Sequence, residues 1–297
     1  MSSIFKNRYG ELRSGWSIAM ALVLILGGNL LGAIFVPEGR EDDIAVVMIV
    51  TLVYGIFTIG GCLLLFKLLY KRPLRQMGLI REGCFSGLLH GFVLGAISVA
   101  LCFIILILTR QIQVSGINKS RLLSIGIIVE LASVSVFAFV QELYCRGYIM
   151  TALKTTRNKW VILLSSSVIF SLAHIINPDV ITVVSLANMA LGGLLTAYMF
   201  VKSGKIWLPA GYHIAANFMS GDVFGMSSDW VHMSETSVFA TILVGNNEFL
   251  LSGPDGDLLT TGFYLLGLLY VRFLIKTPSD TSQGPVWTMD SDLPFTR

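Results

Sequence analysis

The sequence has 297 residues, of which 54% are hydrophobic and 13% are charged, and its mean hydropathy is +0.75. Soluble domains carry about a quarter charged residues, so this composition excludes an ordinary soluble domain and indicates an integral membrane protein. The net charge of +3 forms no basic stripe along the chain, which argues against a nucleic-acid partner.

Apolar segments recur along the whole chain. A membrane-spanning helix needs about 20 mostly apolar residues, and by that measure there are about eight candidates. The sequence therefore predicts an all-α, polytopic membrane helix bundle of about eight transmembrane helices, with the lipid bilayer as a partner. The first segment is longer than the core of a signal peptide, so we expect it to be a retained span. The candidate segments are 14–36, 43–66, 86–109, 122–145, 160–176, 180–200, 206–220 and 258–275.

The charges of the loops predict the orientation. Lys and Arg cluster after the second, fourth and sixth segments, whereas most of the opposite loops are acidic or weakly charged. The positive-inside rule then predicts a multi-pass protein of the cell membrane with both termini in the cytoplasm. The basic loop 110–121 is the one poor fit.

The predicted domain organisation is simple. We expect one transmembrane domain over 1–276, with its motifs at about 122–220, and a disordered, polar cytoplasmic tail over 277–297. The outer loop 221–257 is long and rich in Gly, Ser and acidic residues. It is either a lid or substrate-entry element, or a loop without a specific role.

Two charged residues, Glu142 and Arg146, stand out at the end of a long apolar segment. On a helix their spacing puts both on one face, one turn apart. Ionisable residues this close to the hydrocarbon interior are costly and by default mark a functional site. A buried ion pair that only locks two helices together is the alternative interpretation.

Three further polar residues, His174, His213 and Asn217, lie in later apolar segments. The rise of an α-helix places them and Glu142 about 12 to 21 Å from the ends of their helices, at overlapping depths in the bilayer. We therefore expect one polar pocket, although a lone intramembrane His more commonly bonds a neighbouring helix. Packing roles alone are expected for Phe170, Gly147 and Gly192-Gly193.

Together these side chains have the chemistry of a hydrolase. A carboxylate beside a neutral imidazole can hold a water and take its proton, and His213 with Asn217 offers two donors for an oxyanion. Arg146 would hold the carboxylate or anchor a substrate carboxylate. The set predicts peptide-bond hydrolysis without a Ser or Cys nucleophile, cofactor or metal. A zinc site made of Glu142, His174 and His213 is a weaker alternative, since the chain has no His-Glu-x-x-His helix.

The three polar segments resemble the motifs of the CPBP family, the CAAX prenyl protease type II and bacteriocin-processing family, also called the Abi family. Its motifs are Glu-Glu-x-x-x-Arg, Phe-x-x-x-His and His-x-x-x-Asn. The resemblance is dense over about 125–220. Within this range it includes residues that flank the motifs, namely Asn177-Pro178 and 203–209. In this chain the motifs are Gln141-Glu142 with Arg146, Phe170 with His174, and His213 with Asn217.

The resemblance implies an all-helical intramembrane endopeptidase that acts on a membrane-associated peptide or protein. In the family the first Glu and the first His activate a water, and the second His and the Asn form the oxyanion site. Bacterial members have been linked to peptide maturation, self-immunity and the regulation of surface or signalling proteins.

The chain departs from the family at the first Glu, which is Gln141 here. An amide cannot act as a general base at neutral pH, and on a regular helix Glu142 points about 100° away from that position. Three interpretations stay open. Glu142 serves as the base after a helix rotation or a local distortion; the protein is a non-catalytic relative with a binding, immunity or signalling-regulatory role; or Gln141 is an engineered inactivating change.

Overall fold

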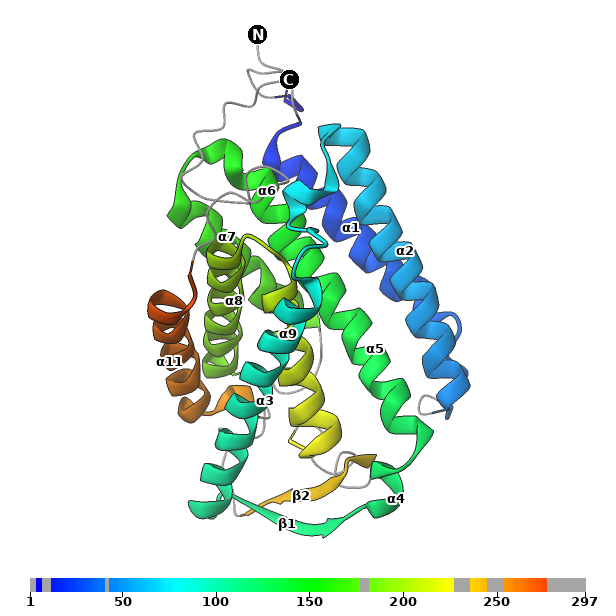
Figure 1. The fold of residues 1–297 in the computed structure, drawn as a ribbon. Coiled ribbons are helices and arrows are strands. Elements are labelled where there is room, and N and C mark those ends of the chain that lie inside the picture. The colour runs from blue at the N-terminus through cyan, green and yellow to red at the C-terminus, as the bar shows by residue number, and fades with distance from the viewer. Residues whose placement is uncertain are drawn as a thin grey trace.

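The structure, a computed structural model, describes residues 4–6, 12–40, 43–176, 182–226, 236–244 and 254–276. The described residues form a bundle of helices with a small two-stranded sheet at one end (Figure 1). The predicted tail 277–297 and the flanking residues Asn177-Pro178 lie outside the described residues, as do parts of the loop 221–257.

A helix lies in each of the eight apolar segments, and the predicted all-α membrane class is confirmed. Among the described residues, five helical runs are long and apolar enough to cross a membrane, namely α1 (Ser14–Ala33), α2 (Ile44–Tyr70), α3 (Cys84–Leu108), the run Ile125–Thr156 and α8 (Val183–Ser203). Two others, α7 and α11, are apolar but shorter. The bounds are Ser14–Ala33 for α1, Ile44–Tyr70 for α2, Cys84–Leu108 for α3, Ile125–Glu142 for α5, Lys159–Ala173 for α7, Val183–Ser203 for α8, Trp207–Phe218 for α9 and Leu258–Leu274 for α11.

The outer faces of the bundle are apolar. On α2, Leu52, Ile56 and Leu68 are exposed, and Leu108 at the end of α3 is 75% exposed. Such a surface would be costly in water and is suited to lipid chains. The protein is therefore a multi-pass membrane protein in a bilayer environment.

The helix that carries Glu142 and Arg146 continues beyond the predicted segment 122–145. After α5 it continues as one wide π-helical turn, Leu143–Ile149, then as α6, Met150–Leu153, and a last 3-10 turn, Lys154–Thr156. A π-helical turn inserts an extra residue and rotates the segments before and after it relative to one another. The local distortion that the sequence left open is therefore present directly after Glu142.

Side-chain caps set the starts of the helices that surround the site. Asn158 accepts from the backbone of Trp160 at 3.0 Å and begins α7, and Asp257 accepts from Leu259 at 2.7 Å and begins α11. At the start of α8, Thr182 and Ser185 form a reciprocal capping box. Such caps satisfy backbone N–H groups that would otherwise lack partners, so these short helices have defined starts.

A short antiparallel sheet, which the sequence analysis did not predict, links two loops. Strand β1, Ile112–Ile117, pairs with β2, Phe239–Leu243, and a short helix α4, Lys119–Leu122, follows β1. The ring of Phe239 packs on Phe103 of α3 at 5.7 Å between centroids. The poorly fitting loop 110–121 is thus a structured element. Its alternating pattern spans too few residues to stand out beside the long apolar helices.

The helix α3 crosses α9 at very close range. A Cβ built on Gly91 would overlap the Leu208 carbonyl oxygen, and one built on Gly95 would lie 2.9 Å from the Cβ of Ala215. Gly211 of α9 allows the same approach, because a Cβ there would overlap the Leu88 carbonyl oxygen. Small residues drive such close contacts in membranes, and here they fix the position of the helix that carries His213.

We predict that Gly91→Ala lowers the free energy of unfolding by about 1–3 kcal/mol, because the added methyl must push α3 away from the α9 backbone. Thermal unfolding of the purified protein in detergent measures the effect. Gly60→Ala in α2 is the control, since a Cβ at Gly60 meets no atom within 4 Å. Equal melting temperatures for the two variants would contradict the proposed close crossing.

Candidate functional site

The site is built on an ion pair inside the bundle. The side chains of Glu142 and Arg146 are both 0% exposed, and Arg146 Nε lies 3.1 Å from Glu142 Oε2. Both atoms lack a hydrogen-bond partner among the described residues, so their contact is an ion pair without good hydrogen-bond geometry. The predicted pairing of an acid and a base on one helix face is confirmed.

The second carboxylate oxygen of Glu142 binds a ring nitrogen of His213. Glu142 Oε1 lies 2.8 Å from His213 Nδ1, and His213 is 8% exposed. A carboxylate next to Nδ1 favours the tautomer in which Nδ1 carries the proton and Nε2 has the free lone pair. The contact therefore fixes both the orientation of the imidazole and the nitrogen that it presents elsewhere.

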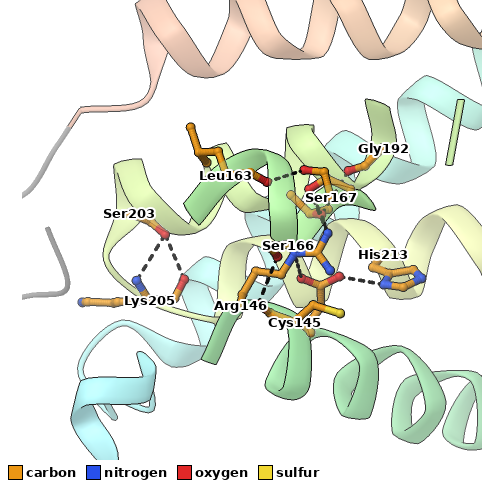
Figure 2. A network of polar contacts seen from close by, with 12 residues as sticks. Cys145, Arg146, Leu163, Ser166, Ser167, Gly192, Ser203, Lys205 and His213 are labelled. Atoms are coloured by element: carbon orange, nitrogen blue, oxygen red, sulfur yellow. Dashed lines mark hydrogen bonds and ion pairs between the residues drawn. The ribbon is translucent and has the colours of Figure 1, made fainter. Parts of the chain in front are cut away.

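Arg146 joins two more helices to this centre (Figure 2). Its Nη2 donates to the Gly193 carbonyl oxygen of α8 at 2.9 Å and also to Thr196 Oγ1. Its guanidinium lies 4.7 Å above the ring of Phe170 on α7. Because Glu142 also binds α9 through His213, one ion pair connects α5, α7, α8 and α9.

The π-helical turn is held in place from three sides. Ser166 of α7 donates to the Cys145 carbonyl oxygen at 3.1 Å, and Tyr144 donates to the Thr58 carbonyl oxygen of α2 at 2.9 Å. Tyr148 shares a hydrogen bond of 2.7 Å with Ser17 of α1. These bonds supply partners to polar groups of a turn that would be costly to expose to lipid.

The two predicted close-packing sites of glycine are confirmed. A Cβ on Gly147 would lie 3.2 Å from the Met77 carbonyl oxygen, and one on Gly193 would lie 3.2 Å from Phe170 Cδ1. Phe170 does more than the packing that the sequence analysis expected. Its ring contacts Arg146, and its centroid lies 4.8 Å from that of His174 and 5.5 Å from that of His213.

A cavity of about 70 Å³ lies beside the ion pair, with room for a few waters. It is lined by the end of α7, by α8 and α9, and by residues around the turn that precedes α11. All three predicted residues His174, His213 and Asn217 line it. The other lining residues are Phe170, Met189, Gly192, Thr196, Tyr212, Ala216, Asp255 and Tyr264.

His174 is fixed by its own helix. Its Nδ1 lies 2.8 Å from the Phe170 carbonyl oxygen, which can only accept, so Nδ1 carries the donated proton. The lone pair is then on Nε2, as it is in His213. Two imidazoles of the same tautomer, one from α7 and one from α9, thus border one cavity.

The structure divides the predicted site residues into two groups. His174, His213 and Asn217 border the cavity, whereas Glu142 and Arg146 are sealed behind it. The acid contacts His213 directly, whereas the sequence analysis expected a carboxylate that shares a water with an imidazole. Gln141 Oε1 is buried and has no hydrogen-bond partner in the described part of the chain.

Among the lining residues that the sequence did not predict are Asp255 and Tyr264, which bind each other. Asp255 lies in a short 3-10 turn, Pro254–Gly256, and accepts a hydrogen bond of 3.1 Å from the hydroxyl of Tyr264. The sequence signal at this position is an acidic residue shortly before the last helix, which by itself indicates only an acidic loop. Reduced hydration inside the bundle raises the pKa of Asp255 above the usual range, and the Tyr264 hydroxyl opposes this shift.

The described residues contain no group of three or more His, Cys, Asp and Glu side chains placed to hold a metal ion. Glu142, His174 and His213, the three ligands of the alternative zinc site, are therefore not arranged as a ligand set. The first of them already binds Arg146 and His213 through its two oxygens.

Comparison with known proteins identifies one family. Residues 123–219 match the Rce1-like family, which is described as type II CAAX prenyl endopeptidase Rce1-like. The matched range contains Glu142, Arg146, His174, His213 and Asn217. No curated protein and no solved structure matches the chain.

We predict that Glu142→Gln lowers the free energy of unfolding by about 3–5 kcal/mol, because it leaves the Arg146 guanidinium charged and unpaired in the bundle. Denaturant unfolding in detergent measures the loss. The double variant Glu142→Gln with Arg146→Gln should recover part of it, since neither charge remains buried alone.

The control for this measurement is Glu130→Gln. Glu130 forms a partly exposed pair with Arg121, with 3.4 Å between Oε1 and Nη2, and such pairs contribute about 1 kcal/mol or less. A loss of similar size in Glu142→Gln and Glu130→Gln would show that the buried pair is not the constraint described above.

Proposed function

The chain belongs to the CPBP family through residues 123–219, which match the type II CAAX prenyl endopeptidases, and on that premise we propose an intramembrane endopeptidase. Its substrate is a membrane-associated peptide or protein. The observation that carries the proposal is the cavity inside the bundle, which two imidazoles of fixed tautomer and one amide border together. Such a set can move a proton and stabilise an oxyanion.

In the proposed reaction a water in the cavity attacks the carbonyl carbon of the peptide bond. Nε2 of His174 takes the proton of that water, since Nδ1 already donates to the Phe170 carbonyl oxygen. The tetrahedral oxyanion is stabilised by the Asn217 amide and by the imidazolium form of His213, in which Nε2 has taken a proton from solvent before the water attacks. The C–N bond then breaks, and the leaving amine takes the proton from His174.

Glu142 and Arg146 act in this proposal as positioning residues. Glu142 holds Nδ1 of His213 and fixes the orientation of the ring, which leaves Nε2 for the oxyanion. Arg146 pairs with Glu142 and does not line the cavity. This division of roles follows from burial, because neither charged side chain lines the cavity.

We also propose the orientation that the loop charges predict. Both termini lie in the cytoplasm, and the end of the bundle that carries β1 and β2 lies on the opposite side of the cell membrane. In Figure 1, α7, α8 and α11 end at a level from which α3, α5 and α9 continue toward the sheet.

One observation favours a second candidate, a non-catalytic family member with a binding or regulatory role. Gln141 cannot ionise, and both oxygens of Glu142 are engaged. This candidate requires that the chain cleave no reporter peptide and that Gln141→Glu create activity. The endopeptidase is supported if the unaltered chain cleaves the reporter peptide and Gln141→Glu raises the rate by no more than about tenfold.

We predict that His174→Ala and His213→Ala each lower the rate of cleavage of a membrane-anchored reporter peptide by about 10²–10⁴-fold, because each removes a proton-transfer or oxyanion group. The assay uses purified protein in liposomes, with the amount of folded protein checked by size-exclusion chromatography.

His90→Ala is the matched control. His90 is an exposed histidine of α3 whose Nε2 lies 3.1 Å from the Tyr270 hydroxyl, away from the cavity. Its replacement should change the rate by less than about threefold. Unchanged cleavage in both cavity variants would refute the endopeptidase.

A further inference from the structure

Asp255 is the carboxylate that borders the cavity. The other acid of the site, Glu142, is fully buried and engaged on both oxygens, and it does not line the cavity. Asp255 lines this cavity together with His174 and His213, and it also lines an adjoining cavity of about 90 Å³ that extends toward α3. Asp255 is therefore the acidic residue, among those described, that lines the cavity beside both imidazoles.

The turn that carries Asp255 is anchored by several side chains. Asn188 of α8, which is 1% exposed, donates to the backbone carbonyl oxygens of Asp255 at 2.7 Å and Asp257 at 2.9 Å. The hydroxyl of Thr261 donates back to Asn188 Oδ1 at 2.6 Å, and that of Thr260 donates to the Pro254 carbonyl oxygen at 2.6 Å. A buried amide with satisfied bonds holds this turn against α8 and fixes where the carboxyl group lies.

We propose that Asp255 is a further catalytic residue, which holds the attacking water and stabilises the imidazolium of His174. The inference rests on the proposed endopeptidase. Tyr264 donates to Oδ1 of Asp255, so the other oxygen is the one assigned to the water. Gln141 provides no carboxylate at the first position of the motif, and Asp255 supplies one from a different segment of the chain.

The step balances without a co-reactant. The water bonds to the carbonyl carbon while His174 Nε2 takes its proton, so a neutral imidazole becomes a cation beside the Asp255 carboxylate. The oxyanion collapses as the C–N bond breaks, and the proton passes from His174 to the amine. Asp255 keeps its negative charge throughout, and one water adds across one peptide bond.

The proposal predicts the pH dependence of cleavage. The titratable groups that face Asp255 are His174, His213, Tyr212, Tyr264 and Cys102. Burial raises the pKa of Asp255. The cleavage rate should therefore fall as the pH is lowered, and the midpoint of this fall, the acid limb of the pH–rate profile, should lie above the pKa of an ordinary Asp. Tyr264→Phe removes a donor that stabilises the ionised form, and the acid limb should therefore move to still higher pH.

The main test compares Asp255→Asn with Asp257→Asn in the reporter assay. Asp255→Asn should lower kcat by about 10²-fold or more and change KM by less than about threefold. Asp257→Asn removes the same charge from the same turn, but Asp257 caps α11 and Asn is an equally good cap. The control should therefore stay within about threefold of the unaltered chain.

The outcomes separate the inference from the function on which it rests. Loss of activity in His174→Ala with full activity in Asp255→Asn would overturn the role of Asp255 and leave the endopeptidase intact. Equal losses in Asp255→Asn and Asp257→Asn would assign the effect to packing of the turn and also overturn it. If Tyr264→Phe leaves the acid limb of the pH–rate profile unchanged, the proposed role of Asp255 is contradicted, because that role depends on the ionised carboxylate of Asp255.

A second measurement needs no turnover. Diethyl pyrocarbonate modifies neutral imidazoles, and mass spectrometry gives the labelling of His174 relative to the exposed His90 in the same sample. Across pH 5.5–8, Asp255→Asn should raise the relative labelling of His174 by about threefold or more at some pH, because the imidazolium loses its anionic neighbour. Curves for Asp255→Asn that coincide with those of Asp257→Asn would overturn the inference.

Discussion

The ion pair between Glu142 and Arg146 is the constraint on which the rest of the structure depends. A guanidinium that is 0% exposed in a membrane bundle cannot be hydrated, so every element near it must supply a partner. The Gly193 carbonyl oxygen, the Thr196 hydroxyl and the Phe170 ring do so from α8 and α7. The absence of a side chain at Gly193 is part of this arrangement, because a Cβ there would press on Phe170. The pair thus determines which helices touch.

The site gains its chemistry where short helices end inside the bundle. The helix α7 ends at Ala173 and α11 begins at Leu258, so the turns that carry His174 and Asp255 lie beside the cavity instead of at the bundle surface. Helix ends carry backbone groups that need polar partners, and polar side chains gather there for that reason. Around the site four polar atoms lack a hydrogen-bond partner among the described residues. Glu142 Oε2 and Arg146 Nε face each other in the ion pair, whereas Gln141 Oε1 and Arg146 Nη1 have no such contact. A protein optimised only for stability would not retain them, which is typical of functional sites.

The parts of the site that obey helical periodicity were predictable from the sequence. Glu142 with Arg146 and His213 with Asn217 are each four residues apart, and the overlapping depths of their helices indicated one pocket. The partner of Glu142 was not predictable, because the π-helical turn after it has no clear sequence signal and changes the direction of the side chains. Asp255 was missed for a different reason. The charge of a loop residue was read as evidence of topology, and only tertiary bonds from Asn188 bring that residue into the bundle. The β1–β2 pairing likewise joins segments that are far apart in the chain.

The amide at Gln141 is consistent with the electrostatics of the buried pair. One carboxylate and one guanidinium are neutral as a unit, whereas a second carboxylate next to Glu142 would add a net charge beside two side chains that are 0% exposed. An amide at this position keeps the shape of the side chain and avoids that charge, so the substitution favours stability at the expense of a base on this helix. The hydrolytic site then requires an acid that does not share the α5 environment. A carboxylate on the turn before α11 meets this requirement, because it borders the cavity and is held by α8 without contact with Arg146.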